Sequence, residues 1–426
     1  LGELLLGHRQ LIADLVAKPR DLEPQRELAQ QVSDALAANR KVCIIDSGYY
    51  AGHEDLQDSG VTASPNSETG DPFTDFCGHG SHVAGIIAGI NNAVGVAGVL
   101  PNQNVNLHIV KVFGDDCGWA SSSTLIHALQ ECRNSGANIV SMSLGGDDTS
   151  VFEENAFRTA WNAGVISVAA AGNDGETAYS YPGSYESVIS VAAVGSTKAI
   201  ASFSQSNDQV DLAAPGVAIL STVPYKETST VSIAGTTTEG TWIENAARTD
   251  TAGVSGPLAF GGLCDSVDVT WAGKVVLCDR GTITFQLKVQ NVQAAGGVAA
   301  VISNNITGNF NGTLGTGNSS TIPAIGIAQA DGQVLAGRLG SLASVVSFAE
   351  KPANGYEAWS GTSMSTPYVA AVAALVWSQN PNWTNAQVRS ALEASAEDLG
   401  APGRDDSYGW GLVRAKAALD LLNAGG

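Results

Sequence analysis

Basic residues are scarce in this chain, with 21 Lys and Arg against 41 Asp and Glu among its 426 residues. The net charge of −20 repels phosphate groups, so it argues against nucleic acids and anionic membranes as partners. No stretch approaches the roughly 18 consecutive apolar residues that a membrane-spanning helix needs. Charged residues make up only 15% and hydrophobic residues 44% of the chain, a composition that disfavours disorder.

The cysteines include no CxxC pair and no Cys/His cluster at zinc spacing. Because there are six of them, an even number, they are better explained as three disulfides, which indicates a secreted, extracellular protein. The opening string LGELLL is too short for the apolar region of a signal peptide, so we expect the numbering to begin after any export signal.

Residues 1–40 have helical apolar spacing interrupted by Pro19 and Pro24, which predicts an N-terminal segment of two helices joined by a kinked linker. From residue 41 on, short apolar runs alternate with helical patterns. This alternation predicts an α/β fold with a mostly parallel sheet covered on both faces. The expected strands are 42–45, 107–112, 139–144, 165–171 and 188–194, and the expected helices are 79–90, 121–134 and 151–163.

The α/β rhythm stops near Pro224 and resumes with the apolar run after Ser363. The residues between are rich in Thr, Gly, Val and Asn, and the clearest helical pattern among them lies around 285–296. We therefore expect one α/β domain, formed by residues 41–224 and 355–426, interrupted by a β-rich insertion of residues 225–354.

Three polar residues stand at positions suited to a site. Asp46 ends a predicted strand in CIIDSG, and open α/β sheets build sites at the carboxyl ends of their strands. His79 precedes an apolar helix in CGHGSHVAGIIAG. Ser363 begins another in SGTSMSTPYVAAVAALVW, where we expect Pro367 to lie in the first turn, which has no N–H to lose. Taken singly, each position is weak evidence, because such residues are often structural.

Taken together, the strings DSG, HGSHVAG and GTSMSTP resemble the active-site motifs of subtilisin-like serine proteases, in that family's order of Asp, His and Ser. The resemblance covers roughly residues 42–223 and 356–422, and it implies the family's three-layer α/β fold. It also implies a triad in which Ser363 attacks the scissile carbonyl, His79 takes and returns its proton, and Asp46 orients the imidazole.

The nucleophile's helix departs from the family pattern at three positions. This chain has Ser365, Tyr368 and Ala371 where the family usually has Ala, His and Gly. Because these residues lie behind the nucleophile, we expect them to affect packing more than chemistry.

The resemblance also implies a substrate site. Asn173, in VAAAGNDG, corresponds to the family's side-chain donor to the oxyanion, with the N–H of Ser363 as the second donor. The strings SLGG and AAG resemble the two walls of the S1 pocket. Trp119 and Phe113 are candidates for an outer subsite, although core packing is the commoner role of such aromatics. The residues implied for substrate binding are Ser143, Leu144, Gly145, Ala170, Gly172 and Ser180.

The strings HEDL and INNAVGV resemble the family's high-affinity calcium site, which implies a structural calcium ion. Carboxylate, amide and carbonyl oxygens are the hard ligands that calcium prefers. An ordinary polar loop is the alternative. The implied ligands are the side chains of Asp55 and Asn92 and the carbonyls of Ile90, Val94 and Val96.

Within the insertion, strings at 271–281, 288–305 and 321–335 resemble a protease-associated domain. The resemblance implies a role in substrate selection or access control. A stabilising domain without substrate contact is an equally weighted alternative.

Six cysteines leave the disulfide connectivity open. One pair is local to the insertion and another lies in two loops expected beside the substrate cleft. The pairs we expect are Cys264–Cys278, Cys77–Cys117 and Cys43–Cys132.

The resemblance thus implies a secreted, monomeric endopeptidase that cleaves loosely folded proteins after large apolar residues, with its own propeptide as inhibitor. An esterase of α/β-hydrolase type is disfavoured because no GxSxG string occurs and the triad order differs. A non-catalytic binding protein that uses the insertion is the other alternative, and the presence of all four catalytic groups argues against it.

Overall fold

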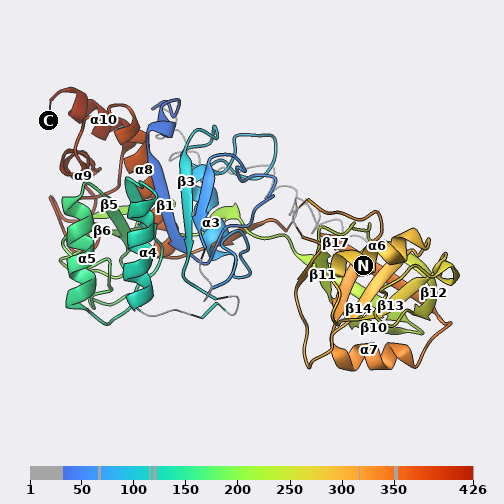
Figure 1. Ribbon diagram of the computed structural model, residues 1–426. Coiled ribbons are helices and arrows are strands. Elements are labelled where there is room, and N and C mark those ends of the chain that lie inside the picture. Colours follow the sequence, from blue (N-terminus) through green and yellow to red (C-terminus); the bar gives the residue numbers. More distant parts are fainter. Residues whose placement is uncertain are drawn as a thin grey trace, which may run out of the picture. The chain divides into compact units, whose positions relative to one another are not determined.

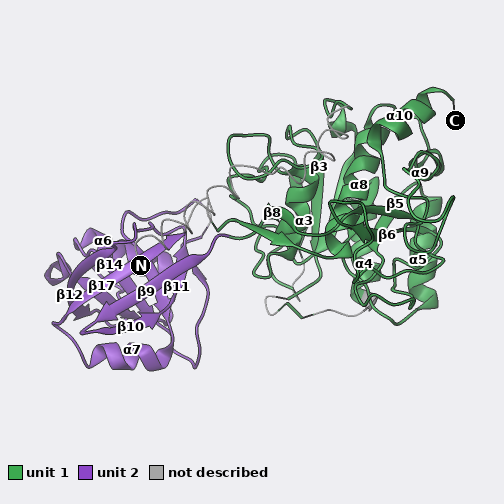
Figure 2. Cartoon of the chain, turned by 180° about the vertical axis from the view of Figure 1, so that it is seen from behind, with its two compact units in different colours: residues 1–224, 352–426 green, residues 225–351 purple. Residues whose placement is uncertain are grey.

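The computed structural model describes residues 32–65, 69–114, 117–118, 122–315, 317–349 and 354–425. The chain divides into two compact units, one of residues 1–224 and 352–426 and the other of residues 225–351 (Figure 2). The predicted insertion, residues 225–354, begins where this second unit begins and ends three residues after it.

A seven-stranded sheet forms the centre of the first unit, and every pair of neighbouring strands is parallel, as the sequence predicts. The second and third strands along the chain lie on one side of the first strand, and the fourth to seventh strands lie on its other side. The strand order therefore reverses beside the first strand, whose carboxyl end lies at a topological switch point. The order is β2 (Val61–Ser64), β3 (Asn106–Lys111), β1 (Lys41–Asp46), β4 (Ile139–Met142), β5 (Ile166–Ala170), β6 (Val188–Val194) and β7 (Leu212–Pro215).

Helices cover both faces of this sheet (Figure 1). Alternate residues of β1 point to opposite faces, so Ile44 joins the apolar cluster under α3 (His79–Ala88) and α8 (Thr362–Ser378). Its neighbour Ile45 joins the cluster under α4 (Ser122–Asn134) and α5 (Val151–Asn162). These two clusters explain the continuous apolar strands, and the three-layer architecture is confirmed. Two C-terminal helices, α9 (Asn385–Ala394) and α10 (Ala415–Asn423), extend the first cluster.

Two edge strands, β2 and β7, were not predicted. Each has only four residues, VTAS and LAAP, and β2 is only partly buried. Such short strings show no periodicity, so hydrogen bonding to a neighbouring strand rather than local pattern makes them strands.

A hairpin of β8 (Ile219–Thr222) and β18 (Tyr356–Trp359) lies where the chain leaves and re-enters the first unit. Thr222 pairs with Tyr356, and the Val223 N–H donates to the Gly355 carbonyl at 2.8 Å. The two ends of the insertion are therefore adjacent.

The described residues of the second unit form a nine-stranded mixed sheet with two α-helices, α6 (Phe285–Ala294) and α7 (Gln329–Ala336), and a short 3₁₀ helix, η3 (Val269–Trp271). Separate apolar clusters contain buried residues of the two helices, Val289 of α6 and Leu335 of α7. The strand order is β10 (Thr236–Glu239), β9 (Glu227–Ile233), β17 (Leu342–Ala349), β12 (Val254–Phe260), β13 (Val275–Asp279), β14 (Ala299–Ser303), β16 (Ala324–Ile327), β11 (Thr241–Glu244) and β15 (Gly312–Thr313).

The N-terminal helical prediction is wrong where it can be compared. Most of residues 1–40 lie outside the described residues, but 32–36 are not helical and only a short 3₁₀ turn, η2 (Ala37–Asn39), follows. The carboxylate of Asp34 accepts from the backbone and side-chain nitrogens of Asn102 at 3.1 and 2.7 Å. These tertiary hydrogen bonds override a weak local helical preference.

All three expected disulfides are present, as Cys43–Cys132, Cys77–Cys117 and Cys264–Cys278. Within the described part of the chain, no helix combines the length and apolarity that crossing a membrane requires.

Candidate active site

The switch point brings Asp46 and His79 together. β1 ends at the fully buried Asp46, and His79 is the first residue of α3. His79 Nδ1 donates to Asp46 Oδ1 at 2.8 Å, which leaves Nε2 as the basic nitrogen of the neutral ring. Burial lowers the pKa of His79, but the charge and hydrogen bond of Asp46, with the charge of Asp75, raise it above its ordinary value of 6.5.

Ser363 is the second residue of α8 and faces the end of β4. Its Oγ donates to the carbonyl of Ser143 at 3.2 Å, and Ser143 Oγ donates to the carbonyl of Ser363 at 2.7 Å. The second bond depends on Pro367, which lies deeper in α8 than the predicted first turn, so that prediction is wrong. Because proline has no N–H, the Ser363 carbonyl lacks its helical donor and accepts from Ser143 instead.

Asn173 lies in the loop after β5, and its amide orientation is fixed. Its Oδ1 accepts from the backbone N–H of Thr362 at 2.8 Å and from Thr362 Oγ1 at 2.9 Å. A backbone N–H can only donate, so the oxygen must face Thr362 and Nδ2 remains for an external acceptor.

A second donor lies close to this amide. A Cβ built on Gly361 would lie 3.7 Å from the Ser363 nitrogen and 3.8 Å from Asn173 Nδ2, so both donors lie near one point. The Ser363 N–H belongs to the first turn of α8, where backbone donors have no intrahelical acceptor. The two N–H groups can together bind an oxyanion.

The strings expected to form the S1 walls lie together with Ser180. The strings at 143–145 and 170–172 lie at the adjacent carboxyl ends of β4 and β5, and Gly146 pairs with Tyr181 through backbone bonds of 2.9 and 2.8 Å. A Cβ on Gly145 would lie 2.4 Å from Ser180 Oγ, so a side chain at this position would displace the Ser180 hydroxyl. The structure thus brings together Ser143, Leu144, Gly145, Ala170, Gly172 and Ser180.

The sequence profile of the Subtilase family matches residues 37–257 and 279–411. The chain belongs to the subtilase family, a family of serine endopeptidases. Subtilisin from Bacillus pumilus is 29% identical over 385 residues, which cover 89% of this chain and 91% of that protein. The match to Subtilisin E of Bacillus subtilis (strain 168) has the same identity and length but covers 66% of that protein, so the chain spans just under two thirds of it.

A solved structure is also similar to this subtilase. It is the crystal structure of the psychrophilic subtilisin-like protease Apa1 from the Antarctic psychrotroph Pseudoalteromonas sp. AS-11. The two chains are 39% identical with a TM-score of 0.62, and the match covers 93% of this chain and 96% of that one.

Three residues that the sequence did not single out lie around the predicted triad of this subtilase. Thr362 orients Asn173, and Trp359 stacks on His79 and on His82 with ring centroids 6.1 and 4.7 Å apart. Asp75 accepts hydrogen bonds on both sides of His79. Asp75 and Thr362 lie within a few residues of the motifs, but the sequence does not show which groups they contact.

Of the two aromatics suggested for an outer subsite, Trp119 lies outside the described residues. Phe113 is partly buried and packs against the apolar cluster under α4 and α5, which is the core role weighed as the alternative.

The loop expected to bind calcium lies against Asp55. Asp55 Oδ2 accepts from the Val96 N–H at 2.7 Å, Oδ1 accepts from Asn92 Nδ2 at 2.9 Å, and the Ile90 N–H donates to the Asp55 carbonyl at 3.0 Å. Burial raises the pKa of Asp55 to about 7, because burial removes the water that would stabilise the charged carboxylate. Asn92 Oδ1 accepts from the Val94 N–H at 2.8 Å.

This donor set fits calcium in its chemistry. No Lys, Arg or His among the described residues forms a salt bridge with the buried Asp55, and a bound cation would balance its charge. Coordination through Asn92 Oδ1 requires the Asn92 amide to turn over, because its nitrogen now faces Asp55.

Proposed function

We propose that this subtilase is a secreted serine endopeptidase that cleaves proteins through an acyl-enzyme, with Asp46, His79 and Ser363 as its triad. The observation that carries the proposal is the 2.8 Å hydrogen bond between Asp46 and His79 at the switch point of the sheet, beside a serine at the start of α8.

The chemistry follows from this geometry. The Ser363 hydroxyl turns from the Ser143 carbonyl toward His79 Nε2, gives up its proton and attacks the scissile carbonyl. Asp46 stabilises the imidazolium, and the oxyanion accepts from Asn173 Nδ2 and the Ser363 N–H. His79 then protonates the leaving amine, and a water molecule activated in the same way hydrolyses the acyl-enzyme.

Substrate preference rests on the strings beside the triad. We propose that the backbone of Ser143, Leu144 and Gly145 pairs with an extended substrate, while Ala170, Gly172 and Ser180 line a pocket for a large apolar side chain. The proposed partners are protein or peptide substrates and the enzyme's own propeptide, and the proposed state is a monomer. The three disulfides support an extracellular location.

A fluorophosphonate probe tests the proposal. The wild-type protein should be labelled in a reaction that a peptide substrate slows, and it should hydrolyse peptides better than short esters. Efficient ester hydrolysis without peptide hydrolysis would favour an esterase. Absence of both labelling and hydrolysis would favour a binding protein.

We also propose that calcium binds the side chains of Asp55 and Asn92 and the carbonyls of Ile90, Val94 and Val96. EDTA is then expected to accelerate thermal inactivation and autolysis, because a metal bound only by the native state stabilises it by mass action. Initial rates at low temperature should barely change, excess calcium should reverse the effect, and Asp55→Ala should mimic EDTA. Residual activity after timed heating measures this. Immediate loss of activity in a still-folded enzyme would contradict a structural role.

The residues 225–351 are proposed to be a protease-associated domain that selects substrates or controls access and does not contribute to the chemistry. Because Thr222 and Tyr356 pair in the β8–β18 hairpin, the insertion can be replaced by a two-residue turn. The shortened enzyme should fold and hydrolyse small peptides at near wild-type kcat, while kcat/KM on intact proteins changes if the domain selects substrates. Its Ser363→Ala form gives the background rate. A folded but inactive product would show that the insertion belongs to the catalytic unit.

A further inference from the structure

A second buried carboxylate lies beside the triad. Asp75 precedes α3 by a few residues, is only 3% exposed, and accepts four hydrogen bonds. Its Oδ1 accepts from Ser47 Oγ at 2.8 Å and the Gly78 N–H at 2.9 Å. Its Oδ2 accepts from the N–H and Oγ of Ser81 at 2.8 and 2.7 Å. A group that accepts from so many donors at once acts as a carboxylate.

These bonds hold the start of α3 from both sides of His79. Gly78 is the N-cap of α3, and as a glycine it has no side chain to accept from the first backbone N–H groups. Asp75 takes over this capping role through Gly78 and Ser81, and its negative charge lies at the positive end of the helix. The position of the His79 backbone therefore depends on a residue outside the helix.

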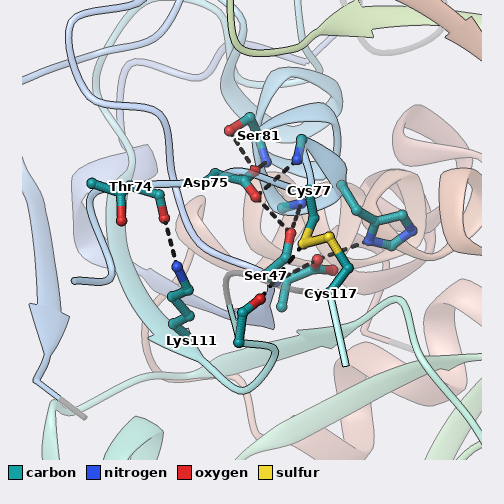
Figure 3. Close-up of a disulfide and its surroundings, with 12 residues drawn as sticks. Ser47, Thr74, Asp75, Cys77, Ser81, Lys111 and Cys117 are labelled. Atoms are coloured by element: carbon teal, nitrogen blue, oxygen red, sulfur yellow. Dashed lines mark hydrogen bonds and ion pairs between the residues drawn. A yellow bond between two sulfur atoms is a disulfide. The ribbon is translucent and has the colours of Figure 1, made fainter. Parts of the chain in front are cut away.

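The same carboxylate also reaches the triad aspartate. Ser47 follows Asp46, and its backbone N–H donates to Asp46 Oδ1 at 2.7 Å, the oxygen that also accepts from His79. Ser47 Oγ donates to Asp75 and accepts from the Gly80 N–H at 2.9 Å. Figure 3 shows Asp75 among Ser47 and Ser81, beside the Cys77–Cys117 disulfide that holds the same loop.

We propose that Asp75 is a positioning residue of the triad, which fixes the end of β1 and the start of α3 together so that Asp46 and His79 keep their hydrogen bond during turnover. The inference rests on the proposed peptidase function. It assigns Asp75 no contact with substrate.

Asp75 also contributes to the charge felt by His79. Burial lowers the pKa of His79, Asp46 raises it, and Asp75 raises it further. On α3 itself, burial lowers the pKa of His82 to about 4, so this ring is neutral above that pH. Lys111 ends β3 beside Asp46, and β18 presents an uncharged indole to the ring. Removing the charge of Asp75 therefore lowers the pKa of His79.

The test is Asp75→Asn in the full chain. The asparagine amide has nearly the same shape as the carboxylate, but its NH₂ group is a donor. It would therefore face groups that themselves donate to Asp75 in the wild type. We expect kcat on a small peptide to fall by about 10- to 100-fold with little change in KM, as for displaced catalytic groups. Because His79 must be neutral to act as base, the acid limb of kcat/KM should move to lower pH. A merely structural role would leave that limb in place.

Two further variants sharpen the result. Ser47→Ala removes the link to Asp46 but keeps the charge of Asp75, so kcat should fall while the acid limb stays. Asp405→Asn is the matched control, since Asp405 accepts three backbone N–H bonds in a loop of the same unit, and its activity should match wild type. Wild-type kcat and an unmoved acid limb in Asp75→Asn overturn the proposal. If that variant does not fold, wild-type kcat in Ser47→Ala overturns it.

Failure of this inference can be distinguished from failure of the proposed function. NMR titration of the His79 ring, assigned by comparison with His79→Ala, reports its pKa without any turnover. A lower pKa in Asp75→Asn supports the positioning role even if no peptide is cleaved, in which case the peptidase proposal alone fails. An unchanged pKa together with wild-type kcat in Asp75→Asn removes the role of Asp75 and leaves the peptidase proposal intact.

Discussion

Ser363→Ala is expected to lower kcat for peptide hydrolysis by about 10⁶-fold, the size known for loss of the triad serine in a subtilisin. Alanine has no hydroxyl to form the acyl-enzyme, whereas the other groups of the site remain. His79→Ala should have a similar effect, because the triad acts as a unit and the hydroxyl is a weak nucleophile without its base. The measurements are kcat with a chromogenic peptide and labelling by a fluorophosphonate, which both substitutions should abolish.

The chain offers a matched control for the serine. Ser365 lies two residues further along α8, is fully buried, and donates to the Ala214 carbonyl at 2.9 Å, away from the triad. Ser365→Ala removes the same hydroxyl from the same helix and should keep near wild-type kcat. A variant that unfolds would also lose activity, so the comparison requires that the melting temperatures of all variants stay near that of the wild type. Near wild-type turnover in a folded Ser363→Ala protein would refute the triad.

Asn173→Leu is expected to lower kcat by about 10²- to 10³-fold with little change in KM, the range known for this amide in subtilisin. The oxyanion exists only along the reaction path, so a donor aimed at it contributes nothing to binding the ground state. Leucine has a similar size but no N–H. Steady-state kinetics with one small peptide separate kcat from KM, and a rise in KM at unchanged kcat would contradict this role.

The same substitution has a structural side effect that needs its own control. Asn173 Oδ1 is the acceptor for the Thr362 N–H, and leucine leaves this buried donor without a partner, at a cost of about 1–3 kcal/mol in stability. Thr362→Val removes the bonds of the hydroxyl to Asn173 Oδ1 at 2.9 Å and to the Gly172 backbone at 3.3 Å, and it keeps the bond from the Thr362 N–H to Asn173. Its kcat should fall far less than that of Asn173→Leu, and equal losses would indicate that helix placement and not oxyanion binding is measured.

Much of the site was predictable because its residues lie in short motifs next to strong local patterns. The strand of β1 is apolar on both faces, so its end at Asp46 was visible, and the helices after His79 and Ser363 are apolar along their length. The disulfide pairs were expected from where their cysteines lie along these elements, and all three are present. Local pattern fixes where an element ends, and an α/β sheet places such ends at one edge.

Local pattern failed where tertiary contacts compete with it. The spacing around Leu36 predicts a helix, yet hydrogen bonds between Asp34 and Asn102 hold residues 32–36 in another conformation. The edge strands β2 and β7 are too short to have a pattern of their own, and pairing with neighbours makes them strands.

By itself, the sequence of this subtilase indicated the α/β architecture and the residues proposed as the triad, because both depend on residue type and on spacing along the chain. The cysteine pairing stayed open until the fold brought each pair together. Only the tertiary structure decided which way the groups face. The Asn173 amide is turned by a backbone N–H of α8, and the Ser363 carbonyl accepts from Ser143 because Pro367 gives it no donor. The carboxylate of Asp75 joins β1 to α3 through Ser47. These are hydrogen bonds between residues far apart in the chain, and their directions exist only once the layers have packed.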